Sequence, residues 1–156
     1  MERLVIVSNR VGSSLRANEG GLATAIQAVV RQRRAIWFGW SGETTDEAPG
    51  PTQVLTEGPL TRMLVDLKRE DYEGYYLGFS NRALWPLFHY RVNLAEYERE
   101  PWAAYNRVNE LFAERLVAML SPDDEVWVHD YHLIPLGAAL RRLGVRNRIG
   151  FFLHIP

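Results

Sequence analysis

Cysteine is absent from this 156-residue sequence, and lysine is nearly absent. Without cysteine the chain has no disulfides, no thiolate zinc sites and no cysteine nucleophiles. Of its 18 basic residues only Lys68 is a lysine, so an anion site must use arginine side chains or backbone amides. Arginine suits phosphate, because its planar guanidinium can donate two parallel hydrogen bonds.

Long apolar runs and an excess of charge of one sign are lacking as well. The run from Leu4 to Ser8 is too short for a signal peptide, and no segment is long enough to span a bilayer. With 18 basic and 19 acidic residues the formal net charge is -1, which gives no bulk attraction to nucleic acid or to a membrane. We therefore expect a cytoplasmic protein with neither kind of partner.

What remains is a globular composition, with 47% hydrophobic and 24% charged residues. A chain of this length fits a single domain, residues 1–156. Apolar runs and helical patterns alternate along it. The pattern predicts, in order, a strand (4–8), a glycine loop (20–21), a helix (22–34), a strand (35–40), a surface loop (42–52), two short strands (54–66) with a turn at Pro59, an amphipathic helix (102–119), a strand (125–129), a helix (135–143) and a strand (148–153).

The last three of these elements form a strand–helix–strand unit, whose connection is right-handed and whose strands are parallel. The sequence therefore predicts an α/β fold with a parallel sheet flanked by helices. In such sheets, ligands bind in the crevice beyond the carboxyl ends of the strands. Polar residues lie at three predicted strand ends: Asn9 and Arg10, the cluster from His129 to His132, and His154.

Gly20 and Gly21 stand at the start of a predicted helix, where backbone amides can approach a phosphate. The alternative for these two glycines is an ordinary flexible turn. For Arg10, the alternative is a solvated surface arginine without a ligand. Trp40 and Trp85 lie among small and polar neighbours, where their rings can stack on a sugar. Periodicity does not separate that role from core packing.

The cluster His129, Asp130 and His132, together with His154, raises the possibility of a divalent metal. On an extended segment His129 and Asp130 point to opposite faces, and no HExxH pattern is present. Hydrogen bonding of a neutral polyol by Asp130 and a histidine uses the same residues without a metal. A structural role at the strand end is favoured for His129, and neither a metal nor a cofactor is predicted.

The serines lack the G-x-S-x-G setting of an activated nucleophile. Short motifs are instead spaced along nearly the whole chain: Val7-Ser8-Asn9-Arg10, Gly20-Gly21-Leu22-Ala23, Trp37 to Glu43, Phe79-Ser80-Asn81, Leu84-Trp85-Pro86, Phe88-His89-Tyr90, His129 to Leu133 and Asn147 to Pro156. Taken together, these motifs resemble the trehalose-6-phosphate synthase family.

The resemblance implies a retaining glycosyltransferase of the two-domain GT-B type. Such an enzyme moves glucose from a nucleotide sugar, usually UDP-glucose, to glucose 6-phosphate and gives α,α-trehalose 6-phosphate. This chain then corresponds to the amino-terminal, acceptor-side Rossmann-like domain, without the carboxy-terminal nucleotide-sugar domain.

The resemblance also assigns roles to individual residues. Asp130 and His154 are the residues nearest the transfer, on the acceptor and the donor side respectively. The assigned contacts are Arg10 and Tyr76 to the acceptor phosphate, Trp40 and Trp85 to the acceptor pocket, Asp130 to acceptor hydroxyls, Gly20 and Gly21 to the donor diphosphate, and His154 to the donor glucose.

Two departures from the family pattern affect these expectations. The loop from Val11 to Glu19 is short for the family, and the second domain is missing. We therefore expect the isolated chain to be inactive and to self-associate through an uncovered apolar edge, or to require a missing carboxy-terminal half. A non-catalytic module that binds a sugar phosphate or a partner chain is the alternative, and a metal-dependent hydrolase is a third hypothesis.

Overall fold

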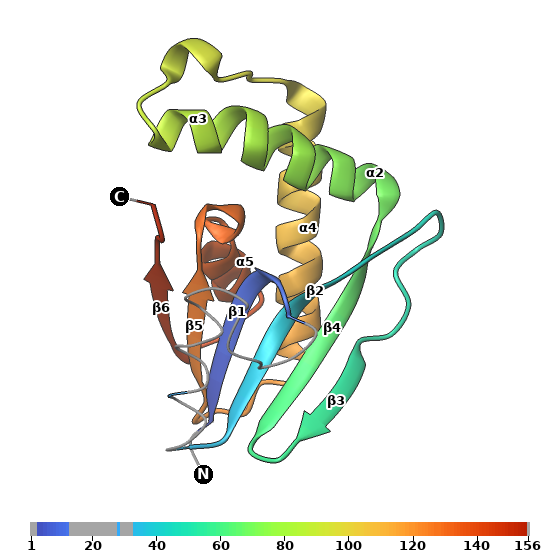
Figure 1. Ribbon diagram of the computed structural model, residues 1–156. Helices are drawn as coiled ribbons and strands as arrows, with labels where there is room; N and C mark the ends of the chain where they lie inside the picture. Colours follow the sequence, from blue (N-terminus) through green and yellow to red (C-terminus); the bar gives the residue numbers. More distant parts are fainter. Residues whose placement is uncertain (1–2, 13–27, 29–32, 156) are drawn as a thin grey trace.

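The structure is a computed structural model that describes residues 3–12, 28 and 33–155 (Figure 1). Three expectations lie outside these residues. They are the phosphate contact of Gly20 and Gly21, most of the helix predicted over 22–34, and most of the loop from Val11 to Glu19.

A six-stranded sheet in the order β3-β4-β2-β1-β5-β6 organises the chain (Figure 1). The pairs β4-β2, β2-β1, β1-β5 and β5-β6 are all parallel, as predicted. The strands are β1 (Leu4–Arg10), β2 (Ala35–Thr45), β3 (Gln53–Glu57), β4 (Leu60–Lys68), β5 (Glu125–His129) and β6 (Arg148–Phe152).

The prediction of a wholly parallel sheet is wrong at one edge, where β3 pairs with β4 in the antiparallel sense. Only Gly58 and Pro59 separate the two strands, and so short a connection can join only antiparallel neighbours. Gly58 has a φ of 59°, which a tight turn requires. The sheet is therefore mixed, although the two short strands and their turn at Pro59 are confirmed.

The surface loop predicted from residue 42 is also wrong in part, because β2 continues to Thr45. The strand passes a register irregularity between Trp40 and Thr44, where Gly42 adopts a φ of 97°. A side chain at Gly42 would place its Cβ 2.8 Å from the Arg10 guanidinium. Glycine at position 42 therefore has two roles: it adopts the positive φ of the irregular strand, and it leaves room for the Arg10 side chain.

Side chains of β1 are buried on both faces of the sheet, as its continuous apolar run predicts. Val5 and Val7 belong to a large core cluster beneath the helices, and Leu4 and Ile6 belong to a second cluster. Helix α4 (Arg99–Val117) and helix α5 (Leu136–Arg142) confirm the two helices predicted for this half of the chain. In the part of the chain that is described, no helix is long and apolar enough to cross a bilayer.

The chain from Arg69 to Phe88, for which the sequence pattern made no prediction, is helical throughout. It comprises α2 (Arg69–Tyr72), the π-helix η1 (Glu73–Leu84) and α3 (Trp85–Phe88). Figure 1 shows this segment lying across the end of α4, beyond the carboxyl ends of the strands. Short 3-10 turns, η2 (Val92–Leu94) and η3 (Tyr131–Leu133), complete the fold.

Strand β6 is the edge strand next to β5. Its Phe151 and Phe152 are 48% and 49% exposed. An exposed apolar edge strand of this kind can pair with another chain.

Candidate functional site

A cavity of about 330 Å³ opens where β1, β5 and β6 end. Three candidates from different parts of the sequence, Arg10, Asp130 and His154, meet in its wall, because parallel neighbours end at the same edge of a sheet. The lining residues are Ser8, Asn9, Arg10, His129, Asp130, His132 and His154.

Hydrogen bonds fix the end of β1 at this cavity. Trp37 donates from Nε1 to Ser8 Oγ over 2.8 Å, and Ser8 Oγ donates in turn to the Arg10 carbonyl over 2.8 Å. The hydroxyl of Tyr75 donates to Asn9 Oδ1 over 2.8 Å. Burial raises the pKa of Tyr75 well above its usual value, so the phenol keeps the proton that it donates. The backbone that carries Arg10 is therefore anchored through the side chains of Ser8 and Asn9.

The Arg10 side chain is exposed and carries its positive charge at the cavity. Its guanidinium carbon lies 5.7 Å from the centre of the Trp40 ring, within cation–π range. Among the residues that the structure describes, no acidic side chain forms an ion pair with Arg10. This arginine is therefore available to an anionic ligand.

Asp130 has an unusual backbone conformation, with φ of 78° and ψ of 167°. This region is nearly exclusive to glycine and costs about 1–3 kcal/mol for other residues. The Asp130 N–H donates to the Phe152 carbonyl over 2.8 Å, and Asp130 Oδ1 accepts from the Tyr131 N–H over 3.0 Å. The Tyr105 hydroxyl also donates to the Tyr131 carbonyl, over 2.5 Å. Backbone strain maintained in this way is typical of functional sites.

His129 is buried at the end of β5, in keeping with the structural role favoured from the sequence. Its Nδ1 lies 2.9 Å from Nε2 of His154, and its own Nε2 has no hydrogen-bond partner among the described residues. Burial first, and the neighbouring His154 second, lower the pKa of His129 from 6.5 to about 4. The ring is therefore neutral at pH 7.

His132 links the cavity to an aromatic cluster behind it. Its ring stacks on Tyr131 at 4.1 Å and on Tyr76 at 5.8 Å, and Tyr76 lies 6.2 Å from Trp40, all between ring centres. Burial lowers the pKa of His132 from 6.5 to about 4, against an opposing effect of Asp130. Its Nδ1 is a second buried nitrogen without a partner in the described chain.

The two tryptophans singled out in the sequence have different surroundings. Trp40 is only 6% exposed and donates from Nε1 to the Glu43 carbonyl, so most of its ring is core. Trp85 is 48% exposed and stacks on His89 at 4.0 Å, outside the cavity wall. Trp40 and Tyr76 therefore back the cavity, whereas Trp85 lies apart from it on α3.

Several residues that shape the site were missed by sequence reasoning. Gly42 makes room for Arg10, while Tyr75 and Tyr105 anchor the two strand ends from distant helices. Ser8 was also missed as a site residue, although its position directly before the predicted Asn9 and Arg10 was a signal. The two tyrosines had none, because their contacts depend on how η1 and α4 pack.

The geometry gives the metal-dependent hydrolase hypothesis no support in the described part of the chain. His129 is directed to His154, and Asp130 accepts a hydrogen bond from its own turn. Within residues 3–12, 28 and 33–155, no group of three or more His, Asp or Glu side chains is arranged to hold a metal ion.

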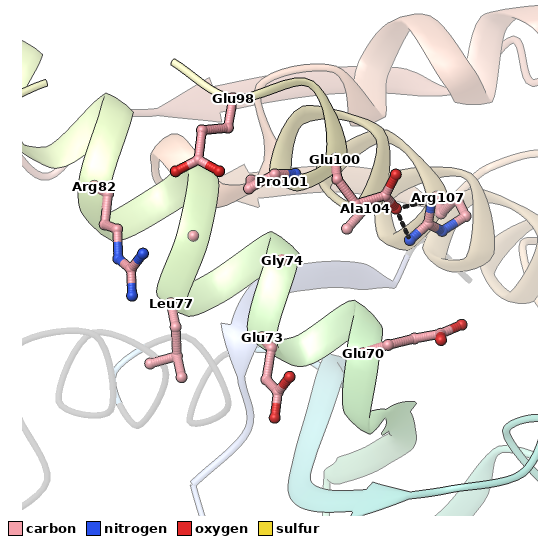
Figure 2. A pocket seen from close by; sticks show the side chains of 11 residues that line it. Glu70, Glu73, Gly74, Leu77, Arg82, Glu98, Glu100, Pro101, Ala104 and Arg107 are labelled. Carbon is pink, nitrogen blue, oxygen red and sulfur yellow. Dashed lines mark hydrogen bonds and ion pairs between the residues drawn. The ribbon is translucent and has the colours of Figure 1, made fainter. Parts of the chain in front are cut away.

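A larger groove of about 810 Å³ runs between η1 and α4 (Figure 2). Both of its arginines have acidic partners: Arg107 contacts Asp71 at 2.8 Å and Glu100 at 3.2 Å, and Arg82 lies 4.0 Å from Glu96. The residues that line it are Glu70, Glu73, Gly74, Leu77, Gly78, Arg82, Glu98, Glu100, Pro101, Ala104 and Arg107, and none of these described residues has a buried polar side-chain atom without a partner.

Comparisons with known proteins identify the family of the chain. A family model described as glycosyltransferase family 20 matches residues 3–156. The trehalose-6-phosphate synthase of Sinorhizobium fredii (strain NBRC 101917 / NGR234) is 54% identical over 161 residues, which cover 100% of this chain and 35% of the relative.

Solved structures match equally well. An α,α-trehalose-phosphate synthase (UDP-forming) from Burkholderia vietnamiensis gives a TM-score of 0.95 at 50% identity, covering 100% of this chain and 34% of its own. A second synthase of the same name, from Burkholderia xenovorans in complex with glucose-6-phosphate, gives a TM-score of 0.89 at 50% identity. The match covers 99% of this chain and 34% of the Burkholderia xenovorans chain. This chain thus spans about a third of the length of these proteins. The predicted fold class is confirmed by these neighbours, which match the chain as an amino-terminal part of a GT-B glycosyltransferase. The chain therefore belongs to glycosyltransferase family 20.

Proposed function

We propose that this chain forms the acceptor side of a trehalose-6-phosphate synthase, which transfers glucose from UDP-glucose to glucose 6-phosphate with retention of configuration. The observation that carries the proposal is the meeting of Arg10, Asp130 and His154 in one cavity at the strand ends. Support also comes from the relative that was solved in complex with glucose-6-phosphate.

Arg10 binds the acceptor phosphate in this proposal. Its guanidinium has an anchored backbone, no acidic partner in the described chain, and a fork geometry that matches phosphate oxygens. Tyr76 assists from the aromatic cluster beside Trp40, and Trp85 reaches the acceptor from α3. The Trp85 role requires the sugar to extend beyond the cavity wall, since that ring is not part of the lining.

Asp130 and His154 hold the two reacting sugars. One Asp130 oxygen accepts from the Tyr131 N–H, which leaves the other oxygen for an acceptor hydroxyl. His154, which follows β6, contacts the donor glucose from the other side of the cavity. The backbone amides of Gly20 and Gly21 contact the donor diphosphate, a role outside the described residues.

Transfer on this site requires no protein nucleophile. The bond from the donor C1 to the phosphate oxygen breaks, the bond from C1 to the acceptor oxygen forms on the same face, and the departing phosphate oxygen takes the acceptor proton. The chain's own residues contribute position and charge stabilisation, which suits an arginine, a carboxylate and an imidazole. The proposal includes no metal and no cofactor.

Binding of glucose 6-phosphate by the purified chain, measured by titration calorimetry, tests the acceptor site. Replacing Arg10→Ala removes charge-assisted hydrogen bonds and is expected to weaken binding about 10- to 100-fold. Arg82→Ala removes an arginine from the groove of Figure 2 and is the matched control, with affinity unchanged. Equal affinity of Arg10→Ala and the unaltered chain would remove Arg10 from the phosphate site.

Turnover separates the synthase from a non-catalytic sugar-phosphate-binding module. Because the chain spans about a third of its relatives, we expect binding of glucose 6-phosphate but no transfer by the isolated chain. In the proposed cytoplasmic enzyme, the donor side comes from the further length that the relatives have, or from an associated chain. Formation of trehalose 6-phosphate from UDP-glucose by the isolated chain would contradict this division of the site.

A further inference from the structure

His129 and His154 form a pair of imidazoles whose rings are held on several sides. Nδ1 of His129 and Nε2 of His154 lie 2.9 Å apart. The Trp127 ring is 4.2 Å from the His129 ring, and the Phe152 ring meets the His154 ring edge-on at 4.8 Å. The rings therefore keep the orientation that places these two nitrogens in contact.

Counting protons in this pair leaves two arrangements. When both imidazoles are neutral, each carries one N–H, and one of these protons lies in the contact. In the first arrangement His129 donates from Nδ1, and its Nε2 is a lone pair. In the second His154 donates from Nε2, so the His129 proton must sit on its own Nε2.

The burial of His129 Nε2 separates the two arrangements. This atom is buried and has no partner among the described residues, so the second arrangement leaves a buried N–H donor unpaired. Orphaned buried donors are rarer in proteins than under-satisfied acceptors, because a buried unpaired N–H loses its hydration with nothing in return. The first arrangement avoids such a donor, and the low pKa of His129 keeps the ring from taking a second proton at pH 7.

We propose that His129 is a positioning residue that fixes the tautomer of His154. By donating from Nδ1 to His154 Nε2, it places the remaining proton of His154 on Nδ1, as a hydrogen-bond donor at the cavity. The sugar atom that His154 meets must then be an acceptor, such as a hydroxyl oxygen of the donor glucose, which rests on the function proposed above.

Long-range nitrogen–proton correlation spectra of the chain labelled with ¹⁵N-histidine test the tautomer directly. Free neutral histidine in water prefers the proton on Nε2, so a proton on Nδ1 of His154 is diagnostic. We expect the Nδ1–H form at His154 near pH 7. A His154 that carries its proton on Nε2 in the unaltered chain overturns the proposal without any variant.

Two substitutions at position 129 separate positioning from packing. In His129→Asn the amide nitrogen lies about where Nδ1 lay and still donates, so His154 keeps the Nδ1–H form. In His129→Gln the amide nitrogen lies nearer the former Nε2, and His154 is expected to revert to Nε2–H. Retention of Nδ1–H in the folded His129→Gln variant contradicts a positioning role, whereas rescue in His129→Asn supports it.

Titration calorimetry with glucose 6-phosphate separates this inference from the proposed function. An Nδ1–H form of His154 in a chain that binds glucose 6-phosphate supports both. An Nδ1–H form in a chain that does not bind it overturns the proposed acceptor site and leaves the positioning role of His129 supported.

Discussion

The cavity at the strand ends and the groove between η1 and α4 differ in the surroundings of their polar groups. The groove is the larger, about 810 Å³ against about 330 Å³, yet its arginines face glutamates and the ion pairs of Arg107 are exposed to solvent. Such exposed pairs are worth about 0–1 kcal/mol each.

The smaller cavity instead combines two buried imidazole nitrogens without partners in the described chain and a strained backbone at Asp130. Both features lower stability and persist only because surrounding contacts maintain them. Size therefore favours the groove, whereas buried unpaired nitrogens and backbone strain favour the cavity as the candidate functional site.

Acidification is expected to affect the cavity most. His129 and His132 have pKa values of about 4 in the fold, against 6.5 without it, so the unfolded chain binds more protons between these values. The free energy of unfolding is therefore highest above pH 6.5 and falls as the pH drops toward 4. His132 alone is expected to contribute on the order of 2 kcal/mol to this loss. Urea denaturation at several pH values between 6.5 and about 4 measures the free energy of unfolding.

His132→Gln isolates this effect from the titration of carboxylates in the same pH range. The variant should lose less stability between pH 6.5 and about 4 than the unaltered chain. His89→Gln, which removes a surface imidazole stacked on Trp85, is the matched control. Parallel pH profiles for His132→Gln and the unaltered chain would show that the buried ring is not the source.

Gly74→Ala tests the groove. The added Cβ would lie 2.5 Å from Ala104 Cβ, and neither atom belongs to a flexible side chain. Overpacking of this kind costs about 1–3 kcal/mol, against up to about 1 kcal/mol gained in helix propensity. We expect a net loss of about 1–2 kcal/mol by urea denaturation.

The same variant also sharpens the contrast between the two regions, because glucose 6-phosphate should still bind with unchanged affinity. Gly50→Ala is the control for stability, since nothing lies within 4 Å of its added Cβ. A loss of affinity in Gly74→Ala, with the chain folded, would connect the groove to the site.

A pair of substitutions at Asp130 tests the strain at the cavity. Asp130→Gly removes the carboxylate and relieves the strain at φ 78°, whereas Asp130→Ala removes the carboxylate and keeps the strain. The glycine variant should be the more stable of the two by about 1 kcal/mol in thermal or urea unfolding. Neither should bind glucose 6-phosphate as the unaltered chain does. Equal stability of the two variants would mean that Asp130 is not strained.

Elements with a strong local pattern were predictable from the sequence. The apolar run of β1 and the helical period of α4 fix both elements, and a polar residue after each strand locates the cavity. The predicted convergence of Arg10, Asp130 and His154 needed only the rule that parallel strands end at one edge.

The rest depends on contacts between distant segments. The helical run from Arg69 to Phe88 contains Gly74, Gly78 and Pro86, which weaken any local helix signal, and it is stabilised by close packing on α4. The antiparallel pairing of β3 follows from the two-residue turn before Leu60, because so short a connection reverses the chain, whereas the strand–helix–strand pattern predicts only parallel pairs.

The hydrogen bond from Asp130 N–H to the Phe152 carbonyl has a consequence for distance within the site. It joins the end of β5 to the end of β6, and neighbouring strands lie about 4.8 Å apart. On the proposed function, the acceptor and donor contacts are thereby carried by adjacent strands of one sheet. The spacing of the two strands then sets the separation of the acceptor and donor contacts, and it keeps the two sugars close enough to react.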